Sequence, residues 1–182
     1  PGATTDGSMF VTHSDDNELC DERIAFVPGM NWEEGSMRPV YCSAVALGEY
    51  PEYNSFLYPR LVCPERGPIY DTQGYPASIP LGSIPQVAHT YAYFDGSYGI
   101  MNECQLMIGE CTNGAKVQLG PEPGKRIFYS SELSRVALER CSSAREAVEL
   151  MGRLIEEYGY YGTGETLLVG DPGEGWVFEM CC

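Results

Sequence analysis

The sequence has few basic residues. Its 182 residues include 11 Lys and Arg against 26 Asp and Glu, which gives a formal net charge of −15. A protein that binds nucleic acid or an anionic membrane needs a basic surface. The charge therefore excludes both as expected partners. A solvated acidic surface is the plainest interpretation, and an acidic pocket that attracts a free amino terminus is the alternative.

Histidines and long apolar runs are also scarce. His13 and His89 are the only histidines, and the sequence contains no Cys-x-x-Cys pair. A structural zinc site needs such ligands, so we expect neither a metal nor another cofactor. No stretch reaches the roughly 20 apolar residues that a membrane span needs, so we expect no span.

The cysteines are too few for a disulfide scaffold, although their even number permits disulfides. The adjacent Cys181 and Cys182 raise the hypothesis of a crosslinked assembly with an oligomeric or other partner. The compartment stays open, with a secreted or vesicular, lysosome-like one favoured over the cytoplasm. The eight cysteines are Cys20, Cys42, Cys63, Cys104, Cys111, Cys141, Cys181 and Cys182.

The first half of the chain gives mostly loop signals. A turn at residues 3–8 precedes an expected strand over Met9–His13. We expect irregular structure over 15–40, a strand over Val40–Leu47, and long loops over 48–85, where prolines and tyrosines gather. Such loops often carry binding residues, and a purely structural covering is the alternative.

The second half is more regular. Strands are expected over Val87–Phe94, Tyr98–Met101 and Gln105–Ile108, which form an antiparallel meander. A helix is expected over Ser130–Arg140. A second begins after the capping box Ser143–Glu146, shows an apolar stripe at helical spacing, and ends at Gly159. Two further strands, Glu165–Gly170 and Gly175–Met180, flank a turn at Asp171.

This order of strands, helices and strands predicts one α+β domain, with helices packed on a largely antiparallel sheet. Three stretches then carry a family resemblance. They are residues 3–17 (ATTDGSMFVTHSDDN), residues 98–112 (YGIMNECQLMIGECT), and a third set formed by residues 144–150 (AREAVEL), 157–165 (EYGYYGTGE) and 176–179 (WVFE). In this order and spacing, they resemble the dipeptidase/secernin-type cysteine peptidases.

The resemblance implies an N-terminal-nucleophile hydrolase fold, an αββα sandwich of two antiparallel sheets between helix layers. Members are much longer than 182 residues. We therefore expect residues 1–182 to form a single, partial domain that lacks the first strand and the C-terminal part.

The resemblance also implies hydrolysis of amide bonds in dipeptides or small peptides. The family's nucleophile is an N-terminal cysteine whose own α-amino group acts as the base. By the family's spacing this cysteine lies roughly seven residues ahead of Pro1, so we expect the chain as given to be inactive.

The remaining site residues follow from the resemblance one by one. Asp16, or Asp15 beside it, matches the acidic residue that helps hold the nucleophile, and Asn17 follows as a substrate-binding residue. The family usually has Arg-Asn just before this acidic residue, where His13-Ser14 stand here. An Asx turn at a strand end is the structural alternative for these residues.

Asn102 matches an asparagine that, in related hydrolases, donates to the oxyanion of the tetrahedral intermediate. A turn asparagine between short strands is the alternative. Glu165 follows a Gly/Tyr loop and is either a substrate-facing residue or part of a simple helix-to-strand connection.

Two functions are compatible with these sequence features. One is an active cysteine-type dipeptidase of which this chain is a part. The other is a catalytically inactive homologue that keeps the fold and acts as a binding or structural component of an assembly.

Overall fold

The computed structural model describes residues 2–14, 23–43, 53, 61–72 and 74–181. Its strands are β1 (Ala25–Val27), β2 (Met30–Asn31), β3 (Met37–Tyr41), β4 (Pro80–Pro85), β5 (His89–Thr90), β6 (Tyr93–Asp95), β7 (Gly99–Asn102), β8 (Met107–Thr112), β9 (Glu165–Gly170) and β10 (Gly175–Met180). Its helices are α1 (Ser130–Arg140) and α2 (Ala144–Tyr158), with short 3-10 helices η3 (Pro64–Arg66) and η4 (Pro68–Tyr70).

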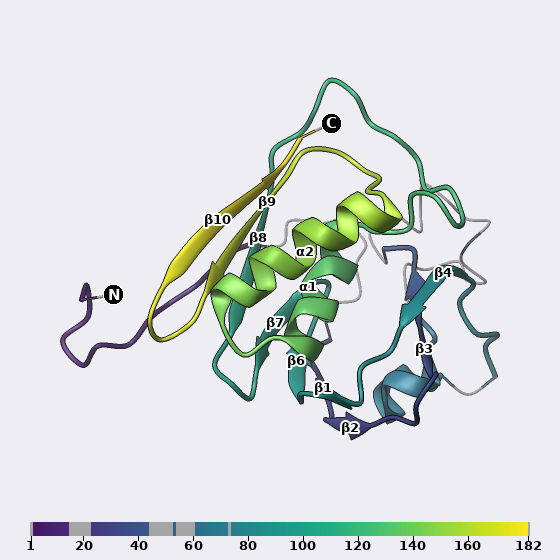
Figure 1. Ribbon diagram of the computed structural model, residues 1–182, viewed down its shortest axis with the longest axis horizontal. Helices are drawn as coiled ribbons and strands as arrows, with labels where there is room; N and C mark the ends of the chain where they lie inside the picture. The colour runs from purple at the N-terminus through teal and green to yellow at the C-terminus, as the bar shows by residue number, and fades with distance from the viewer. Residues whose placement is uncertain (1, 15–22, 44–52, 54–60, 73, 182) are drawn as a thin grey trace.

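Six strands form one antiparallel sheet in the order β1-β6-β7-β8-β9-β10. Two small ribbons, β2-β5 and β3-β4, stand beside it. Both long helices cover the same face of the six-stranded sheet (Figure 1). We call this the helix face, and the opposite one the open face. The predicted α+β class, with antiparallel sheets and a helix layer, is confirmed.

The helices have the predicted bounds. Ten of the eleven residues of α1 are buried, which leaves Arg140 as the exception. At the start of α2, the Ser143 hydroxyl accepts a bond from the Glu146 amide, while the Glu146 carboxylate accepts bonds from Ser142. Gly159 ends α2 with a φ of 73°, a conformation that glycine adopts without strain.

The C-terminal hairpin and the meander are confirmed as well. β9 and β10 have the predicted bounds, and the chain turns between them at Asp171. The expected strand over 87–94 is instead two short strands, because residues 89–90 pair with β2 while residues 93–95 join the large sheet. β7 and β8 begin one and two residues later than predicted.

The predictions for the first half are less accurate. The stretch 15–40, expected to be irregular, contains β1, β2 and most of β3. The stretch 48–85, expected to be loops, ends in β4. These strands are held by partners far away in sequence, which local patterns do not reveal. Val40 and Tyr41 do lie in a strand, and residues 44–47 lie outside the described part.

The predicted strand over Met9–His13 is wrong, since these residues have no regular structure. The segment instead crosses the open face above β8 and β9. A Cβ atom at Gly109 would lie 2.8 Å from Val11 Cγ1, and one at Gly170 would lie 3.0 Å from Val11 Cγ2. Two glycines thus allow the N-terminal segment to lie close against the sheet.

Candidate functional site

A groove of about 580 Å³ follows the N-terminal segment on the open face of the sheet. One wall is the segment Val11–His13. The other comes from the β6-β7 turn and from Ile100, Met101 and Met107. The His13 ring meets the Tyr98 ring edge-on, with 6.2 Å between centroids. The groove is mainly apolar, with His13 as a titratable group at its edge.

The predicted acidic residues follow this wall in the sequence. Asp15, Asp16 and Asn17 come directly after Ser14 and lie outside the described residues. Their catalytic and substrate-binding roles therefore stay predictions. His13, which stands where the family usually has arginine, borders the groove.

Asn102, the predicted oxyanion donor, is buried between the sheet and the end of α1. Its Nδ2 donates to the backbone oxygens of Leu138 and Cys141 at 2.9 and 2.8 Å. Its Oδ1 accepts from the amides of Cys104 and Leu106 at 3.0 and 3.1 Å. Both amide hydrogens are thus already donated, and donation to an oxyanion would require a bond to α1 to open. The oxyanion role stays a prediction.

Glu165, the predicted substrate contact, begins β9 and is fully buried on the helix face. Its Oε1 accepts a bond from the Tyr129 hydroxyl at 2.6 Å. Among the described residues, no donor reaches Oε2. Burial, followed by hydrogen bonding to Glu110, raises the pKa of Glu165 to about 8. The raised pKa favours the protonated form of Glu165 at neutral pH.

Glu110 is a site residue that was not predicted from the sequence. It lies on β8 with its oxygen accepting from Thr112 Oγ1 at 2.8 Å. The strand register sets Thr112 opposite Glu165 and Glu110 opposite Leu167, so both acids share the helix face. The alternation of Ile108, Glu110 and Thr112 along one strand was the available signal. An acid at a buried strand position needs a partner.

The free thiols among the described cysteines include Cys63, Cys104, Cys111, Cys141 and Cys181. Burial raises the pKa of Cys63 and of Cys141 to about 12 in each case. Cys42 is also buried, and its sulfur accepts a bond from the Tyr161 hydroxyl at 3.4 Å. Since the thiolate is the nucleophilic form, the raised pKa makes Cys63 and Cys141 poor nucleophiles at neutral pH. The exposed described thiols are Cys111 and Cys181.

The described residues contain neither a cluster of metal ligands nor a membrane-spanning helix. No three His, Cys, Asp or Glu side chains among them lie together as a metal site would require. No helix in this part of the chain combines the length and apolar character needed to cross a bilayer.

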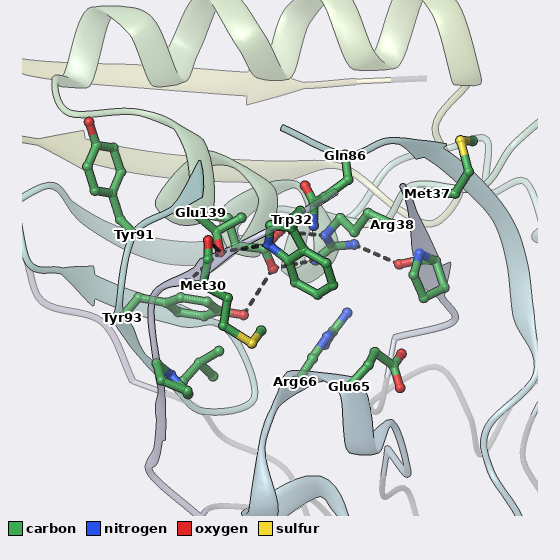
Figure 2. A pocket seen from close by; sticks show the side chains of 14 residues that line it. Met30, Trp32, Met37, Arg38, Glu65, Arg66, Gln86, Tyr91, Tyr93 and Glu139 are labelled. Atoms are coloured by element: carbon green, nitrogen blue, oxygen red, sulfur yellow. Dashed lines mark hydrogen bonds and ion pairs between the residues drawn. The ribbon is translucent and has the colours of Figure 1, made fainter. Parts of the chain in front are cut away.

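A second cavity, of about 110 Å³, lies on the helix face between the β2-β5 ribbon, β3 and η3 (Figure 2). Apolar side chains from β2 and its surroundings form its walls, with Met30, Trp32 and Met37 among them. Arg38, Arg66 and Glu139 line its polar side.

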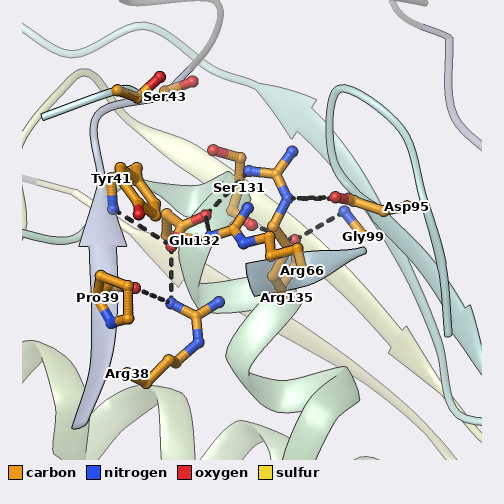
Figure 3. A network of polar contacts seen from close by, with 12 residues as sticks. Arg38, Pro39, Tyr41, Ser43, Arg66, Asp95, Gly99, Ser131, Glu132 and Arg135 are labelled. Atoms are coloured by element: carbon orange, nitrogen blue, oxygen red, sulfur yellow. Dashed lines mark hydrogen bonds and ion pairs between the residues drawn. The ribbon is translucent and has the colours of Figure 1, made fainter. Parts of the chain in front are cut away.

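A buried ion network stands next to this cavity, centred on Glu132 of α1 (Figure 3). Arg66 Nη2 lies 2.5 and 2.7 Å from the two carboxylate oxygens of Glu132, and Arg38 Nη1 lies 2.8 Å from one. Arg135 Nη1 lies 3.2 Å away. Burial alone would raise the pKa of Glu132, but the three guanidinium groups outweigh it and hold that pKa far below its ordinary value.

The network extends in two directions. Arg38 makes a two-bond contact with Glu139 at 2.6 and 2.9 Å. Arg135 Nε lies 2.9 Å from both oxygens of Asp95, whose carboxylate also accepts a bond from the Tyr70 hydroxyl. These contacts tie α1 to β3, η3 and β6, and so hold the helix layer to the sheet.

The comparison with known families agrees with the resemblance seen in the sequence. The sequence profile of peptidase family C69 matches residues 78–182, which is more than half of the chain. The match includes the meander, both long helices and the C-terminal hairpin. On this match, the chain belongs to peptidase family C69, a family of cysteine peptidases.

Proposed function

We propose that this chain is part of a cysteine-type dipeptidase that hydrolyses amide bonds in dipeptides or other short peptides. Membership of peptidase family C69 carries the proposal. The groove beside the N-terminal segment supports it, since it offers a mainly apolar surface lined by Val11–His13, which directly precede the acidic stretch in the sequence.

The nucleophile in this proposal is an N-terminal cysteine ahead of residue 1. The buried thiols support this assignment, because burial keeps them protonated. The cysteine sulfur forms a bond to the peptide carbonyl carbon, and its α-amino group takes the thiol proton. That proton passes to the leaving amine as the C–N bond breaks. Water then cleaves the thioester, which releases the acid and restores the thiol.

The other residues have proposed roles around that step. Asp16 or Asp15 helps to hold the nucleophile, and Asn17 contacts the substrate. For Asn102 and Glu165, the enclosed side chains favour a positioning role over direct contact with substrate.

The proposal is tested on the natural protein. Its N-terminal residue is identified by sequencing and intact mass, and dipeptide hydrolysis is measured before and after treatment with iodoacetamide. We expect an N-terminal cysteine, alkylation at that residue, and loss of hydrolysis. The variant Cys111→Ala is the matched control, because it removes an exposed described thiol and should retain full activity.

Two results would contradict the proposal. If the 182-residue chain alone hydrolysed dipeptides, the nucleophile would be one of its own residues. If the natural protein began with another residue and hydrolysed no peptide, the inactive homologue with a binding or structural role would replace the enzyme. The four internal bonds of Asn102 suit that second function equally.

A further inference from the structure

We propose that the cavity on the helix face is a binding site for a free amino acid with an apolar side chain. Its volume is about 110 Å³. A cavity of about 150 Å³ binds a molecule the size of benzene, so this smaller space takes the apolar side chain of an amino acid, with the polar groups of the ligand at its rim. The isobutyl side chain of leucine has about that size.

The walls of the cavity suit an apolar side chain. Met30, Trp32 and Met37 line it, together with Val27 and two prolines. The Trp32 ring is fixed, because its Nε1 donates to Thr90 Oγ1 at 3.1 Å. Figure 2 shows Trp32 and Met30 above Arg66 and Glu65. An apolar group in this space would contact soft methionine side chains and one rigid aromatic ring.

Arg66 supplies the reason to expect a carboxylate. Its side chain is 6% exposed, and its Nη2 is bound to Glu132. Within the described part of the chain, its Nη1 is buried and has no hydrogen-bond partner. The guanidinium lies over the Tyr41 ring, 5.4 Å from the centroid. A buried N–H without an acceptor is unfavourable, and a ligand oxygen in the cavity would satisfy it.

Arg38, the other arginine of the cavity, provides the contrast. Its Nε and Nη2 both bond to Glu139, and its Nη1 bonds to Glu132 and to the Pro39 oxygen. Each nitrogen of the Arg38 guanidinium therefore already has an acceptor, whereas Arg66 Nη1 has none among the described residues. The position of the unused donor places the ligand's carboxylate at Arg66.

The charged groups that line the cavity favour a ligand that carries both a negative and a positive group. Three arginines of the network face three acids, so its own charges are balanced. The exposed carboxylate of Glu65 lies next to Arg66 on η3 and also lines the cavity. It accepts a bond from the Tyr41 hydroxyl and can receive a ligand ammonium as well. A zwitterion would set its carboxylate at Arg66 and its ammonium at Glu65.

This site stands apart from the proposed catalytic groove. The groove lies against the open face, over Gly109 and Gly170, whereas the cavity reaches Glu139 of α1 on the helix face. The inference goes beyond the proposed dipeptidase activity and can fail independently of it. If both hold, the site binds a product of the reaction and couples the enzyme to the level of free amino acids.

The experiment uses Trp32 as the reporter in the variant Trp176→Phe, which removes the second of the two tryptophans. L-leucine is added while the Trp32 emission is recorded. We expect a saturable change with a half-saturating concentration of about 1 mM or lower. Leucinamide, without the carboxylate, and 4-methylpentanoate, without the ammonium, should each bind at least about tenfold more weakly.

Two variants check the polar contacts. Glu65→Gln changes an exposed residue and keeps an oxygen that can accept the Tyr41 bond, and we expect it to weaken leucine binding about tenfold but leave 4-methylpentanoate unchanged. Arg66→Lys keeps the positive charge near Glu132 but removes the free Nη1. We expect a similar loss of leucine affinity, while the protein stays folded. The absence of saturation, equal binding of leucinamide, or an unchanged affinity in Glu65→Gln would overturn the proposal. Dipeptide hydrolysis plays no part in this measurement.

Discussion

Two buried acids on the helix face have opposite surroundings. Glu132 and Glu165 are both fully buried. Glu132 lies among three guanidinium groups, and its pKa falls far below the ordinary value despite its burial. Glu165 lies beside a second carboxyl group and a tyrosine, and its pKa rises to about 8. The first acid stays ionised because cations surround it, and the second stays protonated because none does. Burial alone therefore does not fix the charge of an acid.

The two acids therefore contribute to the pH dependence of stability with opposite signs. The contribution of Glu132 is present above its ordinary pKa of 4.5 and is lost as the pH falls through its lowered value. The contribution of Glu165 is fully present below 4.5 and is lost as the pH rises through about 8. The following variants test whether this contrast holds.

The largest effect is expected for Glu132→Gln. The variant leaves three buried guanidinium groups without their shared carboxylate, and we expect the free energy of unfolding to fall by about 3–5 kcal/mol. Urea unfolding at pH 7 measures it. The control is Glu174→Gln, which breaks the exposed ion pair with Arg145 and should cost less than about 1 kcal/mol. Equal losses in the two variants would show that the network contributes no more than a surface pair.

Asn102 belongs with Glu132 as a buried group whose bonds are all used. In Asn102→Ala, two hydrogen bonds to the end of α1 and two from the turn between β7 and β8 disappear, and we expect a loss of about 3 kcal/mol by thermal or urea unfolding. Asn31→Ala, at an exposed position, should stay within about 0.5 kcal/mol of the unchanged protein. A variant at position 102 that is fully stable yet lacks peptidase activity would instead support the oxyanion role.

At pH 5 the smallest effect is expected for Glu165→Gln, because glutamine resembles the protonated acid. Between about pH 5 and 8, the unchanged protein should lose up to about 1.4 kcal/mol of stability per pH unit through this group. The variant should lack that slope and be the more stable protein at pH 8. Unfolding curves at four pH values, with the exposed Glu156→Gln as control, measure this. Parallel pH profiles for all three proteins would show that Glu165 is ionised at neutral pH.

Local signals were enough to predict the helices and the C-terminal hairpin. The capping box at Ser143 marks the start of α2, and the apolar stripe that follows it marks the buried face. Both signals come from residues that are close together in the sequence. By contrast, β5 has only two residues, and it pairs with residues 30–31, nearly 60 positions earlier. Its existence depends on a partner that a local pattern cannot indicate.

The candidate site likewise combines features that the local sequence indicates with features that only the folded structure reveals. The sequence predicted that Asn102 lies between short strands, whereas it is the last residue of β7. Its bonds to Leu138 and Cys141 depend on how α1 packs on the sheet, so they could not be predicted. The same holds for Arg38 and Arg66, which lie 94 and 66 residues from Glu132 in the chain. Long-range charge pairing leaves no periodic pattern in the sequence.

The near-complete burial of α1 has a consequence for how the protein opens. Its backbone amides are shielded by the sheet, by α2 and by the residues that bind Glu132 and Glu139. Local fraying cannot expose the middle of such a helix to solvent. Its amide hydrogens should therefore exchange with deuterium only when the whole domain unfolds, and their exchange rate should report the global free energy of unfolding. Among the described strands, β10 lies at an edge of the sheet and pairs only with β9, so its amides should exchange much sooner.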